Sequence, residues 1–173
     1  MNKLLLLFYE LRLISPMWYA KYLGVNFGKG CDFQHIYFSS EPYLISIGNY
    51  VQITRGTIFF THSGGWVQRE KYPEWDIFGK INIGSNVYIG NSCLIMPGVT
   101  IGDNVIVGAG SVVTKSIPNN CVIAGNPAKY ITDLNTYELK NKKFNLNTRS
   151  NKNKKDFLKT CPESKFLLKE MLK

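Results

Sequence analysis

Side chains that bind metals are scarce in this chain of 173 residues, which has two histidines and four cysteines. Zinc sites take mainly His and Cys ligands, and the cysteines commonly form CxxC pairs. No such pair is present, and two histidines cannot supply a three-histidine zinc site. The sequence therefore predicts no metal centre, and we interpret the cysteines as reduced structural residues of a cytoplasmic protein.

Long apolar runs are absent as well. No stretch reaches the ~18 apolar residues that a membrane-spanning helix needs, and the most apolar one, 4–14, is interrupted by Glu10 and Arg12. It also lacks the small-residue cleavage site that would follow in a signal peptide. Residues 1–24 are therefore predicted to be an N-terminal helical segment, broken at Ser15-Pro16 because proline disrupts a helix interior.

Acidic residues are fewer than basic ones, 12 against 21, so the net charge is +9. Residues 129–173 hold 12 of the basic and five of the acidic residues, which leaves a charge of only +2 on residues 1–128. A nucleic-acid-binding domain would show a basic patch on its folded body, so we expect no nucleic-acid partner. Residues 132–173 are predicted to be a C-terminal basic extension that is partly helical.

The chain does have a six-residue period. A branched aliphatic residue occupies every sixth position from 83 to 113, namely Ile83, Ile89, Ile95, Ile101, Val107 and Val113. Six is a multiple of the strand period of two and does not match the helical period of 3.6. The pattern therefore predicts an all-β solenoid of short parallel strands, whose stacked turns bury the repeated aliphatics.

The period continues less regularly toward the N-terminus, and the solenoid domain is predicted to span 25–131. A two-residue slip around Glu41-Pro42 shifts the register, and a non-repeating segment, 63–80, interrupts the ladder with aromatic and charged residues. Insertions in solenoids leave from one face and often bind ligands. We therefore predict that 63–80 is an extended loop that contacts the substrate.

The N-terminal segment has a predicted role in this solenoid. The last strands of a solenoid expose unpaired backbone groups, and we expect residues 1–24 to cover one open end. The alternative is shallow docking of the segment on a membrane surface through its apolar side chains, from Leu4 to Phe8 and at Trp18.

One histidine lies where a strand meets the insertion. His62 ends the run Phe59-Phe60-Thr61 and is followed by Gly64-Gly65. An imidazole can accept a proton at neutral pH, and a position between a rigid coil and a loop suits a general base. The alternative for His62 is a polar turn residue. His35 has no comparable setting, and we expect it to be structural.

Several motifs follow one another with fixed spacing after residue 82. They are Ile83-Gly84, Val87-Tyr88-Ile89-Gly90, Ile95-Met96-Pro97-Gly98-Val99-Thr100-Ile101-Gly102-Asp103, Gly108-Ala109-Gly110-Ser111-Val112-Val113-Thr114-Lys115-Ser116-Ile117-Pro118 and Ala124-Gly125-Asn126-Pro127-Ala128-Lys129. This run resembles the hexapeptide-repeat acyltransferases, and among them the maltose/galactoside and polysaccharide O-acetyltransferases. The resemblance covers roughly 27–132 and is dense over 81–131.

The resemblance implies a left-handed parallel β-helix with triangular coils of three hexapeptides. The handedness comes from the family alone, because parallel crossovers in general are right-handed. The resemblance also implies a homotrimer with active sites between subunits, and acetyl-CoA in the groove between adjacent β-helices. The family's catalytic histidine, at the mouth of the insertion loop, matches His62.

On this resemblance, His62 is predicted to remove the proton from an acceptor hydroxyl as that oxygen attacks the thioester. Glu70 and Asp76 are candidates for the group that orients His62. Small residues would let the pantetheine arm lie against the backbone, and lysines would neutralise the phosphates. The family's coenzyme A contacts fall on Asn91, Ala109, Thr114, Lys115 and Lys129.

Two departures from the family fall where the acceptor binds. The run Thr61-His62-Ser63-Gly64-Gly65 replaces an Asn-His-Pro-like surround, and residues 1–24 do not resemble the maltose-type domain. The tryptophans of the insertion are predicted either to stack on a sugar ring or to pin the loop to a neighbouring subunit. The candidates for acceptor binding are Trp66, Arg69, Glu70, Trp75 and Asp76.

The predicted function is an acetyl-CoA-dependent O-acetyltransferase acting on a sugar hydroxyl of a surface polysaccharide (O-antigen or capsule) or its precursor. It is expected in the cytoplasm, with weak peripheral contact at the inner face of the membrane. An N-acetyltransferase of amino nucleotide-sugars and a non-catalytic β-helix scaffold are the alternatives. A γ-type carbonic anhydrase, also a left-handed β-helix, is excluded because it needs three zinc-binding histidines.

Overall fold

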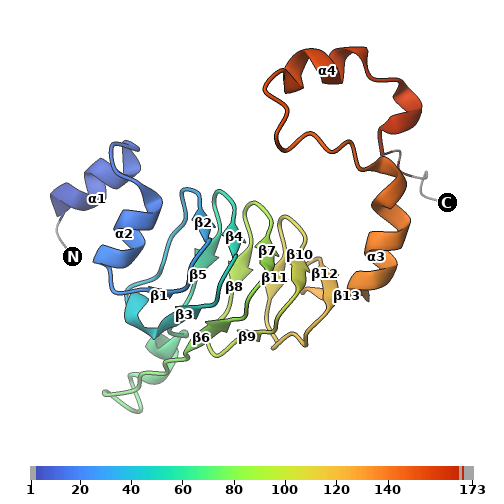
Figure 1. Cartoon of the computed structure of the whole chain (residues 1–173). Coiled ribbons are helices and arrows are strands. Elements are labelled where there is room, and N and C mark those ends of the chain that lie inside the picture. The colour runs from blue at the N-terminus through green and yellow to red at the C-terminus, as the bar shows by residue number, and fades with distance from the viewer. Residues whose placement is uncertain (1–2, 168, 170–173) are drawn as a thin grey trace. The chain divides into compact units, whose positions relative to one another are not determined.

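The computed structural model describes residues 3–167 and 169, and the chain divides into two compact units, Met1–Leu134 and Asn135–Lys173. The first unit begins with two helices, α1 (Lys3–Glu10) and α2 (Pro16–Tyr22), and continues as stacked turns of short strands (Figure 1). The predicted break at Ser15-Pro16 corresponds to the start of α2, where Ser15 is the N-cap and Pro16 the first helical residue.

The chain visits three sheets in the same order in successive turns. The first sheet contains β1 (Asn26–Phe27), β3 (Ile45–Ile47), β6 (Ile81–Ile83) and β9 (Thr100–Ile101). The second contains β2 (Asp32–Phe33), β4 (Gln52–Ile53), β7 (Val87–Ile89), β10 (Val105–Val107), β12 (Cys121–Ala124) and β13 (Lys129–Asp133). The third contains β5 (Ile58–Phe59), β8 (Leu94–Ile95) and β11 (Val112–Val113).

The six-residue period is the burial pattern of these strands. All six aliphatic residues of the period are buried, and none exposes more than 4% of its surface. Parallel pairing stacks the aliphatic residues of successive coils on one another, as where Ile89 pairs with Ile53 on one side and with Val107 on the other. Since side chains alternate across a strand, the inward residues stack into one core. The predicted parallel strands with buried aliphatics are confirmed.

One corner of the coil is held by a column of asparagines. Asn86, Asn104 and Asn120 lie between the first and second sheets, and each has a left-handed backbone with φ near +60° (56°, 57° and 61°). Asparagine tolerates this conformation better than most residues. The amide of Asn86 donates to the Oδ1 of Asn104 at 2.8 Å, and that of Asn104 donates to Asn120 at 2.9 Å. The column therefore ties successive coils together.

The N-terminal helices cover the end of the stack at β1 and β2 (Figure 1). The Tyr9 hydroxyl donates to the carbonyl of Ile36 and accepts its N–H, both at 2.8 Å. The Tyr9 ring stacks between Tyr19 and His35, with centroid distances of 4.1 Å and 4.4 Å. Burial raises the pKa of Tyr9 to about 12. One side chain thus satisfies backbone groups of the first coil that have no strand beyond them.

The opposite end of the stack closes with a hairpin, in which β13 pairs antiparallel with β12. The second unit lies within the predicted C-terminal extension and contains most of α3 (Leu134–Asn141), then α4 (Lys154–Thr160) and two 3-10 helices, Lys142–Phe144 and Glu163–Lys165. These helices bury none of their described side chains. Within the described residues, no helix is long and apolar enough to cross a membrane.

Candidate functional site

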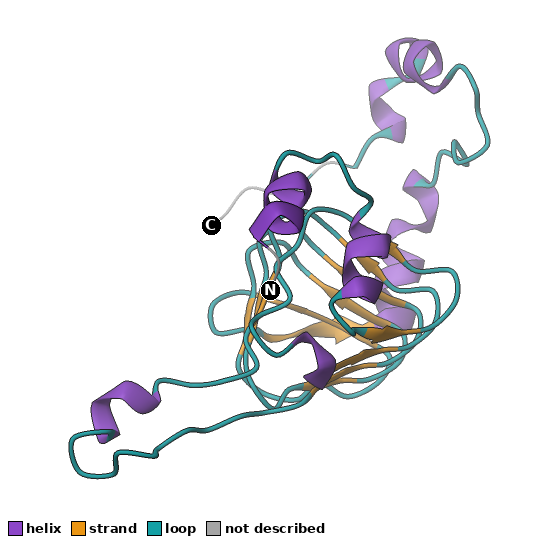
Figure 2. Ribbon diagram, turned by 90° about the vertical axis from the view of Figure 1, so that its left-hand side faces the viewer, coloured by secondary structure: helices purple, strands orange, loops and turns teal. Residues whose placement is uncertain are grey.

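His62 lies at the neck of the insertion loop. The chain leaves the third sheet after β5, and His62 forms an antiparallel bridge with Phe78, where the loop returns. Two backbone bonds close the neck, from Ser63 N–H to the Ile77 carbonyl at 3.0 Å and from Gly79 N–H to the Thr61 carbonyl at 2.8 Å. Figure 2 shows the loop extending away from the coils, with the 3-10 helix Gly65–Gln68 near its tip.

A carboxylate of the preceding coil faces this histidine. Oε2 of Glu41 lies 2.9 Å from Nδ1 of His62, and the side chains are 17% and 45% exposed, respectively. Because an ionised carboxylate only accepts hydrogen bonds, Nδ1 carries the proton and donates it to Glu41. In the neutral form of the ring, Nε2 of His62 then carries no proton. The pair therefore presents a ring nitrogen that can accept a proton from a substrate.

The carboxylate of Glu41 is itself held by a buried hydroxyl. The Thr61 hydroxyl donates to Glu41 Oε2 at 2.5 Å, and its oxygen lies 2.8 Å from the Ser39 hydroxyl. Thr61 has one proton to donate, so Ser39 is the donor in the second bond. The hydrogen bonds from Thr61 and His62 hold the pKa of Glu41 below its usual value, against the opposing effect of burial. Glu41 is thus kept ionised beside the imidazole.

The group that orients His62 is Glu41, so the prediction of Glu70 or Asp76 is wrong. Asp76 instead accepts a hydrogen bond from Arg69 at 2.6 Å, within the insertion loop, and Glu70 is exposed. The hexapeptide period does not point to Glu41, because the pairing offset between these two coils changes from 20 residues, at Phe33 with Ile53, to 21. Tyr37 bridges to Ile58, 21 residues later, and the same offset from Glu41 reaches His62.

The insertion loop folds back on itself through its own side chains. Gly65 is buried against Trp75, whose carbonyl oxygen would lie 2.7 Å from a Cβ at residue 65. Arg69 also donates from Nε to the Trp75 carbonyl at 3.5 Å. Trp66 is 81% exposed and Trp75 37% exposed. The arrangement leaves two indole rings on the surface of a loop that begins next to His62.

The residues predicted to contact coenzyme A lie at different corners of the coil. Asn91 and Ala109 share the corner between the second and third sheets, where Gly110 N–H donates to the Asn91 carbonyl at 2.8 Å. Thr114 and Lys115 follow β11, on the side of the third sheet where His62 follows β5. Both are exposed, as is Lys129 at the start of β13. One chain therefore does not gather these residues around its own His62.

Comparison with known proteins identifies the family. A model of the bacterial transferase hexapeptide family (six repeats) matches residues 80–115. The chain is 50% identical to protein CapG of Staphylococcus aureus over 138 residues, which cover 73% of this chain and 80% of that protein. The chain belongs to the hexapeptide-repeat acyltransferases. This acyltransferase is also 42% identical over 96 residues (55% of this chain) to the galactoside O-acetyltransferase of Escherichia coli K12, of which it spans 47%.

Solved structures of the family agree with the sequence comparison. The acyltransferase is 30% identical to a maltose O-acetyltransferase from Clostridium difficile 630, with a TM-score of 0.56 over 66% of this chain and 72% of that one. It is also 30% identical to a galactoside acetyltransferase in complex with coenzyme A, with a TM-score of 0.52 over 71% and 72% of the two chains. The family resemblance predicted from the hexapeptides is confirmed, and the chain is an enzyme of the acyltransferase class.

Proposed function

We propose that this acyltransferase moves an acetyl group from acetyl-CoA to a hydroxyl of a sugar, within a surface polysaccharide or its precursor. The observation that carries the proposal is the Glu41–His62 pair at the neck of the insertion loop. The named relatives, a galactoside and a maltose O-acetyltransferase, support oxygen of a sugar as the acceptor. The family also supports left-handed winding of the coil.

The proposed reaction needs a single base. Nε2 of His62 takes the proton of the acceptor hydroxyl while that oxygen attacks the thioester carbonyl. The tetrahedral intermediate collapses with cleavage of the C–S bond, and the imidazolium returns the proton to the leaving thiolate. Glu41 is a positioning residue, because its carboxylate stabilises the imidazolium and holds the ring orientation without touching the substrate.

The residues of the proposed acetyl-CoA site fit the parts of that molecule. Ala109 and Gly90 form a tight corner, since a Cβ on residue 90 would lie 2.5 Å from the Ala109 nitrogen. Such small residues allow an extended pantetheine arm to lie against the backbone. Lys115 and Lys129 are exposed cations for the phosphates. Asn91 and Thr114 complete the proposed set with polar side chains at two corners.

A homotrimer would unite the two corners. Asn91 lies at the edge where the chain enters the third sheet, and His62 lies at the edge where the chain leaves it. Five to six residues of extended chain span the sheet between these edges, a distance of about 16–20 Å. In a cyclic trimer whose third sheets face the threefold axis, one corner of each subunit meets the other corner of its neighbour. The outward side chains of the third sheet, Ile58, Leu94 and Val112, are apolar and half-buried in the single chain. They favour this packing.

The location of the enzyme is part of the proposal. We place it in the cytoplasm, with weak peripheral contact to the inner face of the membrane. Support for the membrane contact comes from α1 and the turn after it, where Leu4, Leu7 and Leu11 are each at least half exposed (56%, 50% and 58%). Apolar side chains on such a short helix can rest at the headgroup boundary of a bilayer.

The test is a titration of the purified protein with acetyl-CoA by calorimetry, followed by thiol release with neutral sugars and amino sugars. We expect saturable binding and release of thiol with hydroxyl acceptors. His62→Ala should lose about 10²–10⁴-fold in turnover and keep its affinity for acetyl-CoA. Transfer only to amines would favour an N-acetyltransferase of amino sugars. Full activity of His62→Ala would remove the base from the mechanism.

A further inference from the structure

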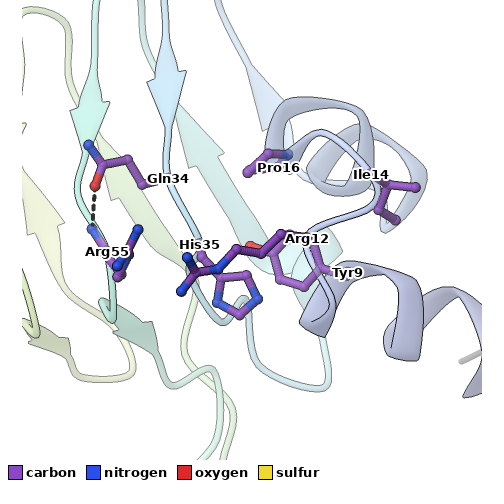
Figure 3. A pocket seen from close by; sticks show the side chains of 7 residues that line it. All are labelled: Tyr9, Arg12, Ile14, Pro16, Gln34, His35 and Arg55. Carbon is purple, nitrogen blue, oxygen red and sulfur yellow. Dashed lines mark hydrogen bonds between the residues drawn. The ribbon is translucent and has the colours of Figure 1, made fainter.

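A second polar site lies where the N-terminal segment meets the first two coils. A pocket of about 240 Å³ opens there, and its polar lining comes from Arg12, Gln34, His35 and Arg55 (Figure 3). Arg12 extends from the turn after α1 toward His35, and Arg55 lies on the far side, next to Gln34. Gln34 Oε1 accepts the backbone N–H of Arg55 at 3.1 Å, which fixes one wall of the pocket.

The charges of this pocket are not balanced. Neither Arg12 nor Arg55 forms an ion pair within the described part of the chain. Nε2 of His35 is buried and makes no hydrogen bond there, although Glu10 Oε2 lies 3.5 Å away. Two guanidinium groups beside one carboxylate leave an excess positive charge, and guanidinium forks match phosphate oxygens in geometry. The chemistry of the lining therefore suits an anion.

Arg12 is held in place by its backbone. It has a left-handed conformation with φ at +58°, which costs free energy for a residue other than glycine. Its N–H donates to the Tyr9 carbonyl at 2.9 Å, and the next N–H, of Leu13, donates to the Phe8 carbonyl at 2.8 Å. The turn therefore projects the arginine toward the coil at a defined position. Tyr9, the residue that caps the coil, also lines this pocket.

The pocket lies on the corner proposed to bind acetyl-CoA. Arg55 occupies this corner one coil before Asn91, and its carbonyl accepts the N–H of Ser92 at 2.9 Å. Arg55 and His62 belong to the same coil. In the proposed trimer, rotation about the threefold axis does not shift a residue along that axis. His62 of a neighbouring subunit therefore lies at the same height as the Arg55 corner. A ligand held in the pocket would thus extend toward the reacting groups.

We propose that this pocket binds the phosphate of the acceptor, which is a sugar joined to a phosphate or diphosphate. The inference rests on the proposed function and specifies its substrate class. A nucleoside diphosphate-sugar and a sugar on a prenyl diphosphate lipid both present this group. In either case Arg12 and Arg55 bind the phosphate, and the sugar lies between the pocket and His62 of the neighbouring subunit.

The test compares R12Q/R55Q and R55Q with wild-type protein, and uses R149Q as a control that removes one arginine elsewhere. The probes are inorganic pyrophosphate, UDP-glucose, and phosphatidylcholine vesicles with and without a prenyl diphosphate. We expect pyrophosphate and UDP-glucose to bind the wild-type protein, and their Kd should be about ten-fold higher or more in R12Q/R55Q. Acetyl-CoA affinity should stay the same in all variants, and R149Q should match wild type.

The possible results separate the two proposals. Binding of UDP-glucose but not of the prenyl diphosphate vesicles would identify a soluble acceptor, and the reverse would identify a lipid-linked one. The pocket assignment is overturned if wild type binds acetyl-CoA but none of the phosphate probes. It is also overturned if R12Q/R55Q weakens the binding of acetyl-CoA as much as that of the phosphate probes, because the arginines would then bind the coenzyme. Failure of wild type to bind acetyl-CoA would instead overturn the proposed function, together with the acceptor role that depends on it.

Discussion

A histidine that acts as a base must keep one ring nitrogen free of its proton. In this enzyme the tautomer is set by Glu41, and Glu41 is kept ionised by the hydroxyl of Thr61. Thr61 is fully buried and Ser39 nearly so. The exposed half of His62 thus rests on a polar cluster that is shielded from water and that orders the ring before a substrate arrives.

Glu41→Gln should lower kcat by about 10–10²-fold, less than the loss expected for His62→Ala. The amide removes the negative charge that stabilises the imidazolium, and it can donate to Nδ1 and so select the wrong tautomer. Steady-state kinetics should show an unchanged KM for acetyl-CoA, because Glu41 is not among the residues proposed to bind it and contacts His62 through Nδ1. A variant with wild-type kcat would show that Glu41 does not act through His62.

The same substitution predicts a change in stability with pH. Since hydrogen bonds from Thr61 and His62 hold the pKa of Glu41 below its ordinary value of 4.5, the ionised form stabilises the fold above that pH. This stabilisation is lost as the pH falls through the lowered pKa. Urea unfolding of wild type and Glu41→Gln should therefore differ most at neutral pH and converge as the pH falls through the lowered pKa of Glu41.

At the scale of elements, the cap and the coil meet through few polar contacts. The hydroxyl of Tyr9 bonds both backbone groups of Ile36, Glu10 Oε2 lies 3.5 Å from His35 Nε2, and the Tyr9 ring stacks on Tyr19 and His35. A coil end without such a cap would leave buried N–H and C=O groups unsatisfied. The cap therefore contributes to the stability of the whole stack and not only to its own order.

Tyr9→Phe should lower the free energy of unfolding by about 1–3 kcal/mol, because both backbone groups of Ile36 lose their partner while the ring stays buried. Tyr22→Phe removes the same hydroxyl from a ring that is 49% exposed and should change stability little. Equilibrium urea unfolding of both variants measures the difference. Equal stability of the two variants would mean that water replaces the Tyr9 hydroxyl at no cost.

The elements differ in how far they could be predicted. Ile89 and Ile95 are read correctly as core residues because a period of six needs only local alternation. Glu41 could not be matched to His62 from the period alone, since the coils there are offset by 21 residues and later ones, such as Asn82 with Thr100, by 18. The role of Tyr9 could not be predicted for another reason. Its hydrogen bonds to Ile36 join a helix to a coil, and the helix is not part of the repeat.

At the scale of the molecule, the three sheets have different outer faces. The outward residues of the first sheet are polar, among them Asn82 and Thr100, and both are exposed. The third sheet turns Ile58, Leu94 and Val112 outward. His62 continues the outward series of Ile58 and Phe60, since Phe59 and Thr61 between them are buried. The apolar face therefore ends at His62, the proposed base, which is where a neighbouring subunit would complete the proposed site.

Leu94→Glu should convert the proposed trimer to monomers and abolish transfer, because a carboxylate would be buried in the proposed interface. Asn82→Glu adds the same charge at the matching position of the polar face, and it should leave both assembly and activity intact. Light scattering after size exclusion gives the mass, and thiol release gives the activity. A monomeric but fully active Leu94→Glu would show that one chain holds a complete site. A trimeric Leu94→Glu would place the interface on another face, and then the corner of Asn91 and Arg55 would need a different neighbour.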